Sequence, residues 1–345
     1  MTGQAGVSAI AGLSMADVEA AARSIAGRAD ATPLIPSPFM SARAGGDLLM
    51  KMETMQPIGA FKLRGALNAV AALPEGTPGV TCCSTGNHGR GVAYAARARG
   101  MRAVICMSDL VPQAKIDGIR ALGAEVRITG RSQDDALAES QRLVAAEGLA
   151  EISPFDDPKV IAGQATIGLE ILRARPDVAT LLVPLSGGGL AAGTAFAAKS
   201  LNPAVRVIGI TMERGAAMAA SLAAGHPVEV EEVPSLADSL GGGIGLHNRL
   251  SFPICRALLD EVVLVSEEEI YHAMQVLYHE DRLVAEGASV VGLAAVLAGR
   301  VSGLAAPVAT VVTGRNLDMA IFTKIVTGQD IALGNHVLKG RPYAA

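Results

Sequence analysis

The sequence of 345 residues contains no tryptophan, and aromatic residues make up only 3% of it. Few aromatic side chains leave few surfaces on which nucleic-acid bases could stack. The net charge is −4, and charges of one sign do not gather into blocks, which argues against a polyanionic partner. We therefore expect no binding to nucleic acid.

Long apolar runs and a leader pattern are missing as well. No apolar run reaches about 18 residues, the length that a membrane helix needs. The first residues, MTGQAGVSAI, lack a basic segment followed by a hydrophobic one. We therefore expect a cytoplasmic protein that does not enter a membrane. Its few cysteines have neither zinc-site nor secreted-protein spacing, so we expect them to be reduced and structural: Cys82, Cys83, Cys106 and Cys255.

Half of the residues are apolar, and the apolar residues form a repeated pattern of strand and helix. The runs GVTCCS, MRAVICM, AEVRITG, TLLVPLS, VRVIGIT, EVVLVS and VATVVTG predict strands, and helical patterns separate them. This alternation predicts an α/β fold with mostly parallel sheets and helices on both faces. Ligands of such sheets bind where strands end, so polar or glycine-rich strand exits are candidate sites.

The stretch PIGAFKLRGA, residues 57–66, places a lysine among small and apolar residues. On a helix, the face of Lys62 also carries small residues, Gly65, Ala66 and Ala69, which would leave room for a ring and its substrate. The positive end of the helix dipole and burial would both lower the pKa of this lysine, toward an amine that attacks a carbonyl. The alternative is a lysine that extends from the helix start into solvent.

Two further stretches place free backbone N–H groups at a helix start. In STGNHGRG, residues 84–91, polar groups around Gly86 favour an anion such as a carboxylate, or else form an ordinary capping turn. In SGGGL, residues 186–190, three glycines leave the backbone free to bind a phosphate, or make only a tight turn. The same glycines fit a loose dinucleotide pattern, although Glu213 lies far from them for its acidic residue.

A fourth strand exit, VVTGRN at residues 311–316, ends in the hydroxyl of Thr313. This hydroxyl either faces a ring nitrogen or begins a turn. A lysine amine, a phosphate site, an anion-binding helix start and a hydroxyl together describe a site for a phosphorylated aldehyde. Pyridoxal 5'-phosphate is the cofactor that needs all four.

The motif KMETMQPIGAFKLRGA resembles the lysine motif of the serine/threonine dehydratases, pyridoxal-phosphate enzymes with the tryptophan-synthase-β-like fold (fold type II). STGNHGRG, PFDDPKVIAGQATIGLEI, LVPLSGGGL and VVTGRN follow in that family's order, and the resemblance covers about residues 30–320. It implies two three-layer αβα domains, with a small domain, 79–157, inserted into a large cofactor-binding domain, 1–78 and 158–345. It also implies a homo-oligomer, either a dimer or a tetramer.

The resemblance also implies residue roles. Lys62 would bind the cofactor aldehyde and act as the catalytic base, and Thr85 is a second catalytic candidate. Phe61 would pack on the ring, Asn87 would bond the ring hydroxyl, and Thr313 would meet the ring nitrogen. The further cofactor-binding residues implied are Ser186, Gly187, Gly188, Gly189, Leu190 and Glu286. The substrate-binding residues implied are Ser84, Thr85, Asn87, His88, Asp238 and Ser239.

The chain departs from the family pattern in several places. Thr85 replaces the second of two serines, which in racemising relatives protonates the opposite face of the substrate, so racemase activity is less expected. Ser186 replaces the first of four glycines, and Arg315 brings a cation near the site. An acidic VEP segment that holds a divalent cation in some relatives reads GITMERGA here, so we predict no metal site.

The reaction implied is β-elimination from a β-hydroxy L-amino acid, which yields a 2-keto acid and ammonia. L-Threonine and L-serine are the default substrates. SLADSLGGGIGLHNR and TMERGAAM are similar to dehydratases associated with hydroxyectoine breakdown. That similarity implies a larger substrate, derived from hydroxyectoine or like 3-hydroxyaspartate, with His247, Arg249 and Arg315 as candidate contacts.

Other functions stay open at this point. A β-replacement enzyme such as cysteine synthase and an amino-acid racemase would use the same fold. A nicotinamide-dependent oxidoreductase would use GGGLAA but would leave Lys62 unexplained. A binding protein without activity would keep the fold alone.

Overall fold

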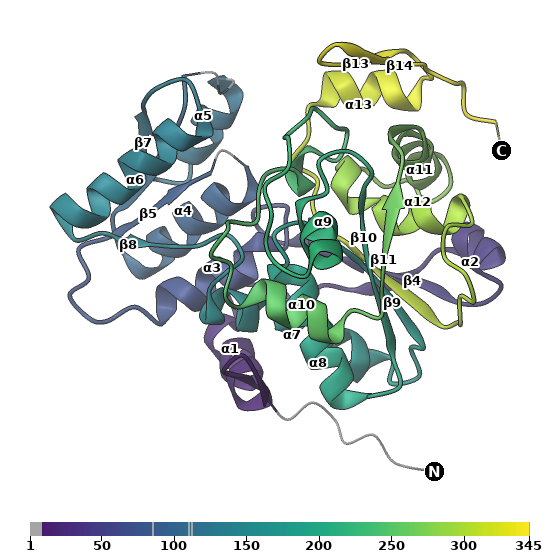
Figure 1. Ribbon diagram of the computed structural model, residues 1–345, viewed down its shortest axis with the longest axis horizontal. Coiled ribbons are helices and arrows are strands. Elements are labelled where there is room, and N and C mark those ends of the chain that lie inside the picture. Colours follow the sequence, from purple (N-terminus) through teal and green to yellow (C-terminus); the bar gives the residue numbers. More distant parts are fainter. Residues whose placement is uncertain (1–8, 85, 110, 112, 345) are drawn as a thin grey trace.

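The computed structural model describes residues 9–84, 86–109, 111 and 113–344. Two main sheets lie in separate parts of the molecule (Figure 1). The larger has the strand order β11–β10–β9–β12–β4–β3, and neighbours are parallel except for β3 with β4. Its strands are β3 (Leu34–Pro36), β4 (Leu48–Met52), β9 (Thr180–Pro184), β10 (Arg206–Met212), β11 (Glu261–Val265) and β12 (Val308–Val312).

Helices cover both faces of the larger sheet. Leu181 and Val183 of β9 point to one face, whereas Leu182 points to the other, as the alternation of a strand requires. The first face packs against α1 (Met15–Ile25), α7 (Pro158–Ala174), α8 (Gly189–Leu201), α9 (Ala217–Ala224) and α10 (Ser251–Leu258). The second packs against α2 (Pro38–Ala44), α11 (Glu267–His279), α12 (Val291–Leu297) and α13 (Met319–Val326).

The smaller sheet has four parallel strands in the order β7–β6–β5–β8, seen at the left of Figure 1. Its strands are β5 (Val80–Cys83), β6 (Ala103–Met107), β7 (Glu125–Ile128) and β8 (Ala150–Glu151). The helices of this part are α4 (Asn87–Arg99), α5 (Gln113–Arg120) and α6 (Gln133–Glu147). The α/β fold with mostly parallel sheets is therefore confirmed. The domain bounds at 79 and 157 stay a prediction.

Helix α3 (Lys62–Ala71) lies between the two parts and packs against both α4 and α7. The remaining elements are short: β1 (Ala9–Ile10), β2 (Leu13–Ser14), β13 (Ile331–Leu333), β14 (His336–Leu338), η1 (Glu53–Met55), η2 (Asp238–Leu240) and η3 (Gly287–Ser289). In the part of the chain that the structure describes, no helix combines the length and the hydropathy that crossing a membrane requires.

Helices α7 and α8 approach each other closely at glycines. A Cβ atom at Gly193 would lie 2.5 Å from the carbonyl oxygen of Ile161, and one at Gly168 would lie 2.5 Å from that of Thr194. Only glycine allows backbones to approach so closely. The start of α7 is fixed by Asp157, whose carboxylate accepts hydrogen bonds from the backbone N–H groups of Lys159 and Val160. These contacts place the start of α8 beside the loop that precedes α7.

Candidate active site

Lys62 begins α3 at the point where three segments of the chain meet. The backbone N–H of Phe61 donates to the carbonyl oxygen of Thr313 at 2.9 Å, which joins the lysine segment to the exit of β12. The Nζ atom of Lys62 donates to the carbonyl oxygen of Pro154 at 2.6 Å. The lysine therefore lies between the end of a strand and the loop before α7.

The surroundings of Lys62 disfavour its charge. Burial lowers the pKa of Lys62 to about 8, although a small part of its surface stays open to solvent. Burial and the nearby Lys62 charge lower the pKa of His88 to about 3, so its ring is neutral at physiological pH. The Nε2–H of His88 donates to the carbonyl oxygen of Ile152 at 2.7 Å. The site thus combines an amine that loses its proton near neutral pH with an uncharged imidazole.

The small residues near Lys62 have a different role from the one that the sequence suggested. A Cβ at Gly65 would lie 2.4 Å from the side-chain nitrogen of Gln164 in α7. A Cβ at Gly91 in α4 would lie 3.2 Å from the Cβ of Ala66. Small side chains here let α4 and α7 pack closely against α3, and that packing buries Lys62 rather than leaving room for a ring.

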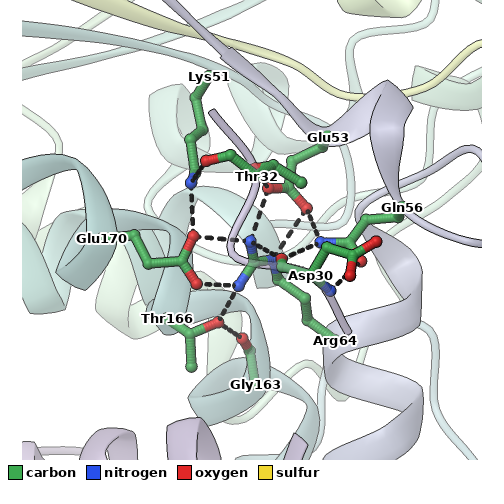
Figure 2. Close-up of polar contacts among 9 residues, drawn as sticks. All are labelled: Asp30, Thr32, Lys51, Glu53, Gln56, Arg64, Gly163, Thr166 and Glu170. Atoms are coloured by element: carbon green, nitrogen blue, oxygen red, sulfur yellow. Dashed lines mark hydrogen bonds and ion pairs between the residues drawn. The ribbon is translucent and has the colours of Figure 1, made fainter. Parts of the chain in front are cut away.

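A buried ionic cluster holds the first turn of α3 in place (Figure 2). The Arg64 side chain is 1% exposed and binds two carboxylates with its planar fork. Its Nε and Nη2 donate to Glu53 at 2.8 Å each, and its Nη1 and Nη2 donate to Glu170 at 2.6 and 2.9 Å. Because Glu53 lies in η1 and Glu170 in α7, Arg64 connects three elements.

The cluster contains two cations and two carboxylates, so its positive and negative charges are equal. Lys51 of β4 donates to Glu170 and to the carbonyl oxygen of Thr32. Burial alone would raise the pKa of Glu53, but the charge and hydrogen bonds of Arg64 outweigh it and lower that pKa. Glu53 therefore stays ionised although its side chain is 0% exposed. The cluster fixes the first turn of α3, and Lys62 is the first residue of that helix.

The glycine turn at residues 186–189 has space for a backbone but not for side chains. Gly188 has φ +92°, a left-handed conformation that favours glycine. A Cβ at Gly187 would lie 2.2 Å from the Phe155 ring, and one at Gly189 would lie 2.9 Å from the Phe155 backbone. Gly188 caps α8 without a side-chain hydrogen bond, so backbone N–H groups remain at the helix start. Leu190 packs into the core, so only its backbone can face the turn.

One loop connects the glycine turn to the lysine. Pro154, which accepts the Lys62 hydrogen bond, directly precedes Phe155, which contacts the glycines. The next residue, Asp156, accepts hydrogen bonds from the backbone N–H groups of Leu250 and Ser251 at 2.8 Å. The structure therefore brings the lysine, the glycine turn and the exit of β12 into one site.

Thr313 and Asn87 belong to the same site, because a Cβ at Gly314, the residue after Thr313, would lie 3.2 Å from the Asn87 amide nitrogen. The hydroxyls of Thr313 and Ser289 lie 2.9 Å apart, and the Ser289 hydroxyl also accepts the backbone N–H of Gly314 at 2.8 Å. The Asn87 amide donates to both carboxylate oxygens of Glu286 at 3.0 and 3.1 Å. Glu286 is 3% exposed, and burial is the main reason that its pKa is raised.

Several donors converge on the Glu286 carboxylate. The backbone N–H of Asn316 donates to it at 2.7 Å and the Ser239 hydroxyl at 3.2 Å. The Asn316 amide donates to Asn87 at 2.6 Å. Beside this cluster is a cavity of about 70 Å³, which we call the Asn87–Glu286 cavity. It is lined by Gly86, Asn87, Arg90, Asp238, Ser239, Glu286 and Asn316.

The structure places most of the residues that the sequence singled out at this site, although it does not test their individual roles. Ser84 is half-buried just before the start of α4, and Asp238 and Ser239 are exposed on the facing wall. Thr85 lies outside the described residues. The His88 ring faces Ile152, so it offers no positive charge to a substrate.

Some residues of the site were missed by sequence reasoning. Asn316 ends VVTGRN and Arg90 lies in STGNHGRG, so both stand inside motifs of the site, and Ser289 lies three residues after Glu286. The carbonyl oxygen of Pro154 and the ring of Phe155 also belong to the site, and no sequence pattern predicts either contact.

Comparisons with known proteins agree with this geometry. A family model described as pyridoxal-phosphate dependent enzyme matches residues 25–314. A protein of Sinorhizobium fredii, provisionally named a threonine dehydratase, is 53% identical over 92% of this chain and 97% of its own length. The L-threonine ammonia-lyase of Thermotoga maritima is 39% identical over 94% of this chain and 81% of its own. The structure of maize serine racemase matches with a TM-score of 0.86 and 31% identity, covering 90% of this chain and 96% of that one.

Replacing Arg64 with methionine tests the ionic cluster. Arg64→Met leaves Glu53 buried without its counter-charge, so we expect a loss of about 3–5 kcal/mol in the free energy of unfolding. Urea denaturation measures it. The control is Arg102→Met, which removes the exposed pairs with Glu125 and Glu147 and should cost less than about 1 kcal/mol. Equal losses in the two variants would contradict the importance of the cluster.

The pKa of Lys62 can be measured through its reactivity. In protein without cofactor, acetylation of Lys62 should increase with pH around a midpoint of about 8, because only the neutral amine reacts. Mass spectrometry across a pH series gives the profile, and the exposed Lys339 provides a reference in the same sample. A Lys62 midpoint as high as that of Lys339 would show that burial does not disfavour its charge.

Proposed function

Because this chain belongs to the pyridoxal-phosphate dependent enzymes, we propose that it eliminates water from a β-hydroxy L-amino acid and releases ammonia and a 2-keto acid. The observation that carries the proposal is the position of Lys62. Its poorly solvated Nζ donates to the loop that contacts the glycine turn, and the preceding residue, Phe61, bonds to the exit of β12. The names of the relatives support the reaction class, since they include an L-threonine ammonia-lyase.

The residues at the site fit pyridoxal 5'-phosphate. At the glycine turn a Cβ would press on Phe155, so only bare backbone fits there, and the start of α8 favours an anion such as the phosphate. We propose that Ser186, Gly187, Gly188, Gly189 and the backbone of Leu190 hold it. Lys62 would bind the aldehyde, and Phe61, Asn87, Glu286 and Thr313 would surround the ring.

In the proposed reaction, the bound cofactor supplies an electron-accepting ring that makes loss of the α-proton feasible. Once the substrate amino group has replaced it on the aldehyde, the freed Nζ atom of Lys62 would accept that proton. With a pKa of about 8, about a tenth of the amine is neutral at pH 7. Thr313 offers a hydroxyl, held by Ser289, at the strand exit. A hydroxyl does not keep a ring nitrogen protonated as a carboxylate would, which favours prompt loss of the β-hydroxyl.

We further propose that the start of α4 binds the substrate carboxylate. Backbone N–H groups there favour an anion, and Ser84, Thr85 and Asn87 add polar groups. His88 would take part as a neutral ring, through its Nδ1 atom, because its Nε2–H is already donated. Asp238 and Ser239 would close over the substrate from the facing wall of the Asn87–Glu286 cavity.

Racemisation is the second candidate, since the chain resembles a serine racemase at a TM-score of 0.86. The nicotinamide alternative is not supported, because the chain matches the model of a pyridoxal-phosphate dependent family. The inserted domain at 79–157, the homo-oligomer and the cytoplasmic location rest on the sequence and remain our predictions.

Lys62→Ala tests the proposed chemistry. The variant has no amine to bind the aldehyde or to take the α-proton, so release of ammonia from serine or threonine should fall at least a thousandfold. Keto-acid formation measures the rate, and Lys339→Ala, which removes an exposed lysine, is the control. The unaltered protein should also absorb visible light until borohydride attaches the cofactor to Lys62. Substantial elimination by Lys62→Ala would overturn the assignment.

Gly189→Ala tests the phosphate site. Its Cβ would press on the Phe155 backbone at 2.9 Å, so we expect affinity for pyridoxal phosphate to fall about tenfold or more. Equilibrium dialysis against the free cofactor measures the affinity. In the control, Gly243→Ala, the new Cβ would have no neighbour closer than 4.0 Å. Cofactor affinity that is unchanged in Gly189→Ala would place the phosphate elsewhere.

A further inference from the structure

Arg90 differs from the other side chains that line the Asn87–Glu286 cavity. Asn87, Ser239, Glu286 and Asn316 satisfy one another by hydrogen bonds. The Nε of Arg90 is buried and has no hydrogen-bond partner. Its guanidinium also forms no ion pair with any residue that the structure describes.

The fold holds this guanidinium against the cavity. Arg90 stands three residues after Asn87, on the same face of α4, and side chains on a helix lean toward its N-terminus. On its other side is Gly118 of α5, where a Cβ would lie 2.9 Å from Nη1 of Arg90. Glycine at that position leaves a slot for the guanidinium and contributes no side-chain acceptor.

An unpaired guanidinium in such a place calls for a ligand. Arginine stays protonated in proteins, and a buried donor without an acceptor costs folding free energy. The group that best matches its planar fork is a carboxylate, which accepts two parallel hydrogen bonds.

We propose that Arg90 binds a second carboxylate of the substrate, so that the preferred substrate is a β-hydroxy amino acid with an acidic side chain, such as 3-hydroxyaspartate. This inference rests on the proposed β-elimination. The α-carboxylate is assigned to the start of α4, and Arg90 lies about 4.5 Å further along the helix axis than Asn87. Both residues line the Asn87–Glu286 cavity, so an anion at the start of α4 and an anion at Arg90 would be neighbours.

Three neighbouring charged groups bear on this assignment. Glu286 also lines the cavity, but its carboxylate oxygens already accept hydrogen bonds from Asn87, Ser239 and Asn316. Arg315, which the sequence suggested as a substrate contact, is exposed, lies against Gly59 and does not line the cavity. Asp238 does line the cavity but is exposed on the facing wall, where solvent screens its repulsion of a second carboxylate. Arg90 is thus the cation best placed for an acidic side chain.

The kinetic test compares substrates with one and two carboxylates on the holoenzyme. The ratio of kcat/KM for 3-hydroxyaspartate to that for serine should fall about 10- to 100-fold in Arg90→Gln, the loss expected for charge-assisted hydrogen bonds. Arg90→Lys should retain part of the ratio. Arg97→Gln, an exposed position two turns along the same helix, makes the same charge change and should leave the ratio unchanged. A ratio unchanged in Arg90→Gln would overturn the assignment.

A binding test separates this inference from the proposed reaction. By calorimetry, the holoenzyme should bind succinate at least tenfold more tightly than butyrate, and Arg90→Gln should lose that difference. If no amino acid is eliminated but this difference depends on Arg90, the proposed reaction fails and the anion site stands. Equal binding of the two acids by the unaltered protein would refute the site. So would a double-mutant cycle in which Arg90 and Asp238 prove coupled in stability, because Arg90 would then serve to pair with Asp238 across the cavity.

Discussion

The site depends on the ion pairs that the Arg64 guanidinium makes. It lies in the first turn of α3, two residues after Lys62, and binds carboxylates from η1 and α7. A buried charge cluster of this kind tolerates little displacement, because each partner would be left desolvated and unpaired. The ion pairs of Arg64 therefore fix the backbone position of Lys62, while the helices packed around α3 exclude solvent from the lysine amine.

In the rest of the site, some polar groups have hydrogen-bond partners within the protein and others do not. One group of side chains is hydrogen-bonded together: Glu286, Asn87, Asn316 and Ser239. A second group joins the hydroxyls of Thr313 and Ser289 to the neighbouring backbone. These sets give the walls a fixed geometry. Among the described residues, the groups with spare hydrogen-bonding capacity include the backbone N–H groups at the starts of α4 and α8, the Lys62 amine and the Arg90 guanidinium. Each of these favours an anion or an electrophile, which is the character of the cofactor and substrate that we propose.

Much of the fold could be predicted from the sequence, because strand and helix patterns are local. The glycine run at 186–189, which the sequence places between a strand and a helix, does join β9 to α8. The family motifs located the site without showing how its walls are paired.

What could not be predicted were partners far apart in the chain. Glu170 lies 106 residues from Arg64, and Asn316 lies 229 residues from Asn87, so neither pairing leaves a local pattern. The small residues near Lys62 were misread for a related reason. Their neighbours belong to α4 and α7, and only the packed structure shows that those helices, rather than a ligand, occupy the space.

The strand order has a consequence for biosynthesis. β12, the last strand of the larger sheet to leave the ribosome, pairs with β9 on one side and β4 on the other, at the centre of the sheet. Until residue 312 has been made, β4 and β9 each expose an unpaired apolar edge, a surface prone to aggregation. The four-stranded sheet, formed within residues 80–151, has no such dependence and can fold early. A nascent chain would thus carry a complete smaller sheet and a larger sheet that still lacks its central strand. The larger sheet is therefore the part that most needs chaperone protection.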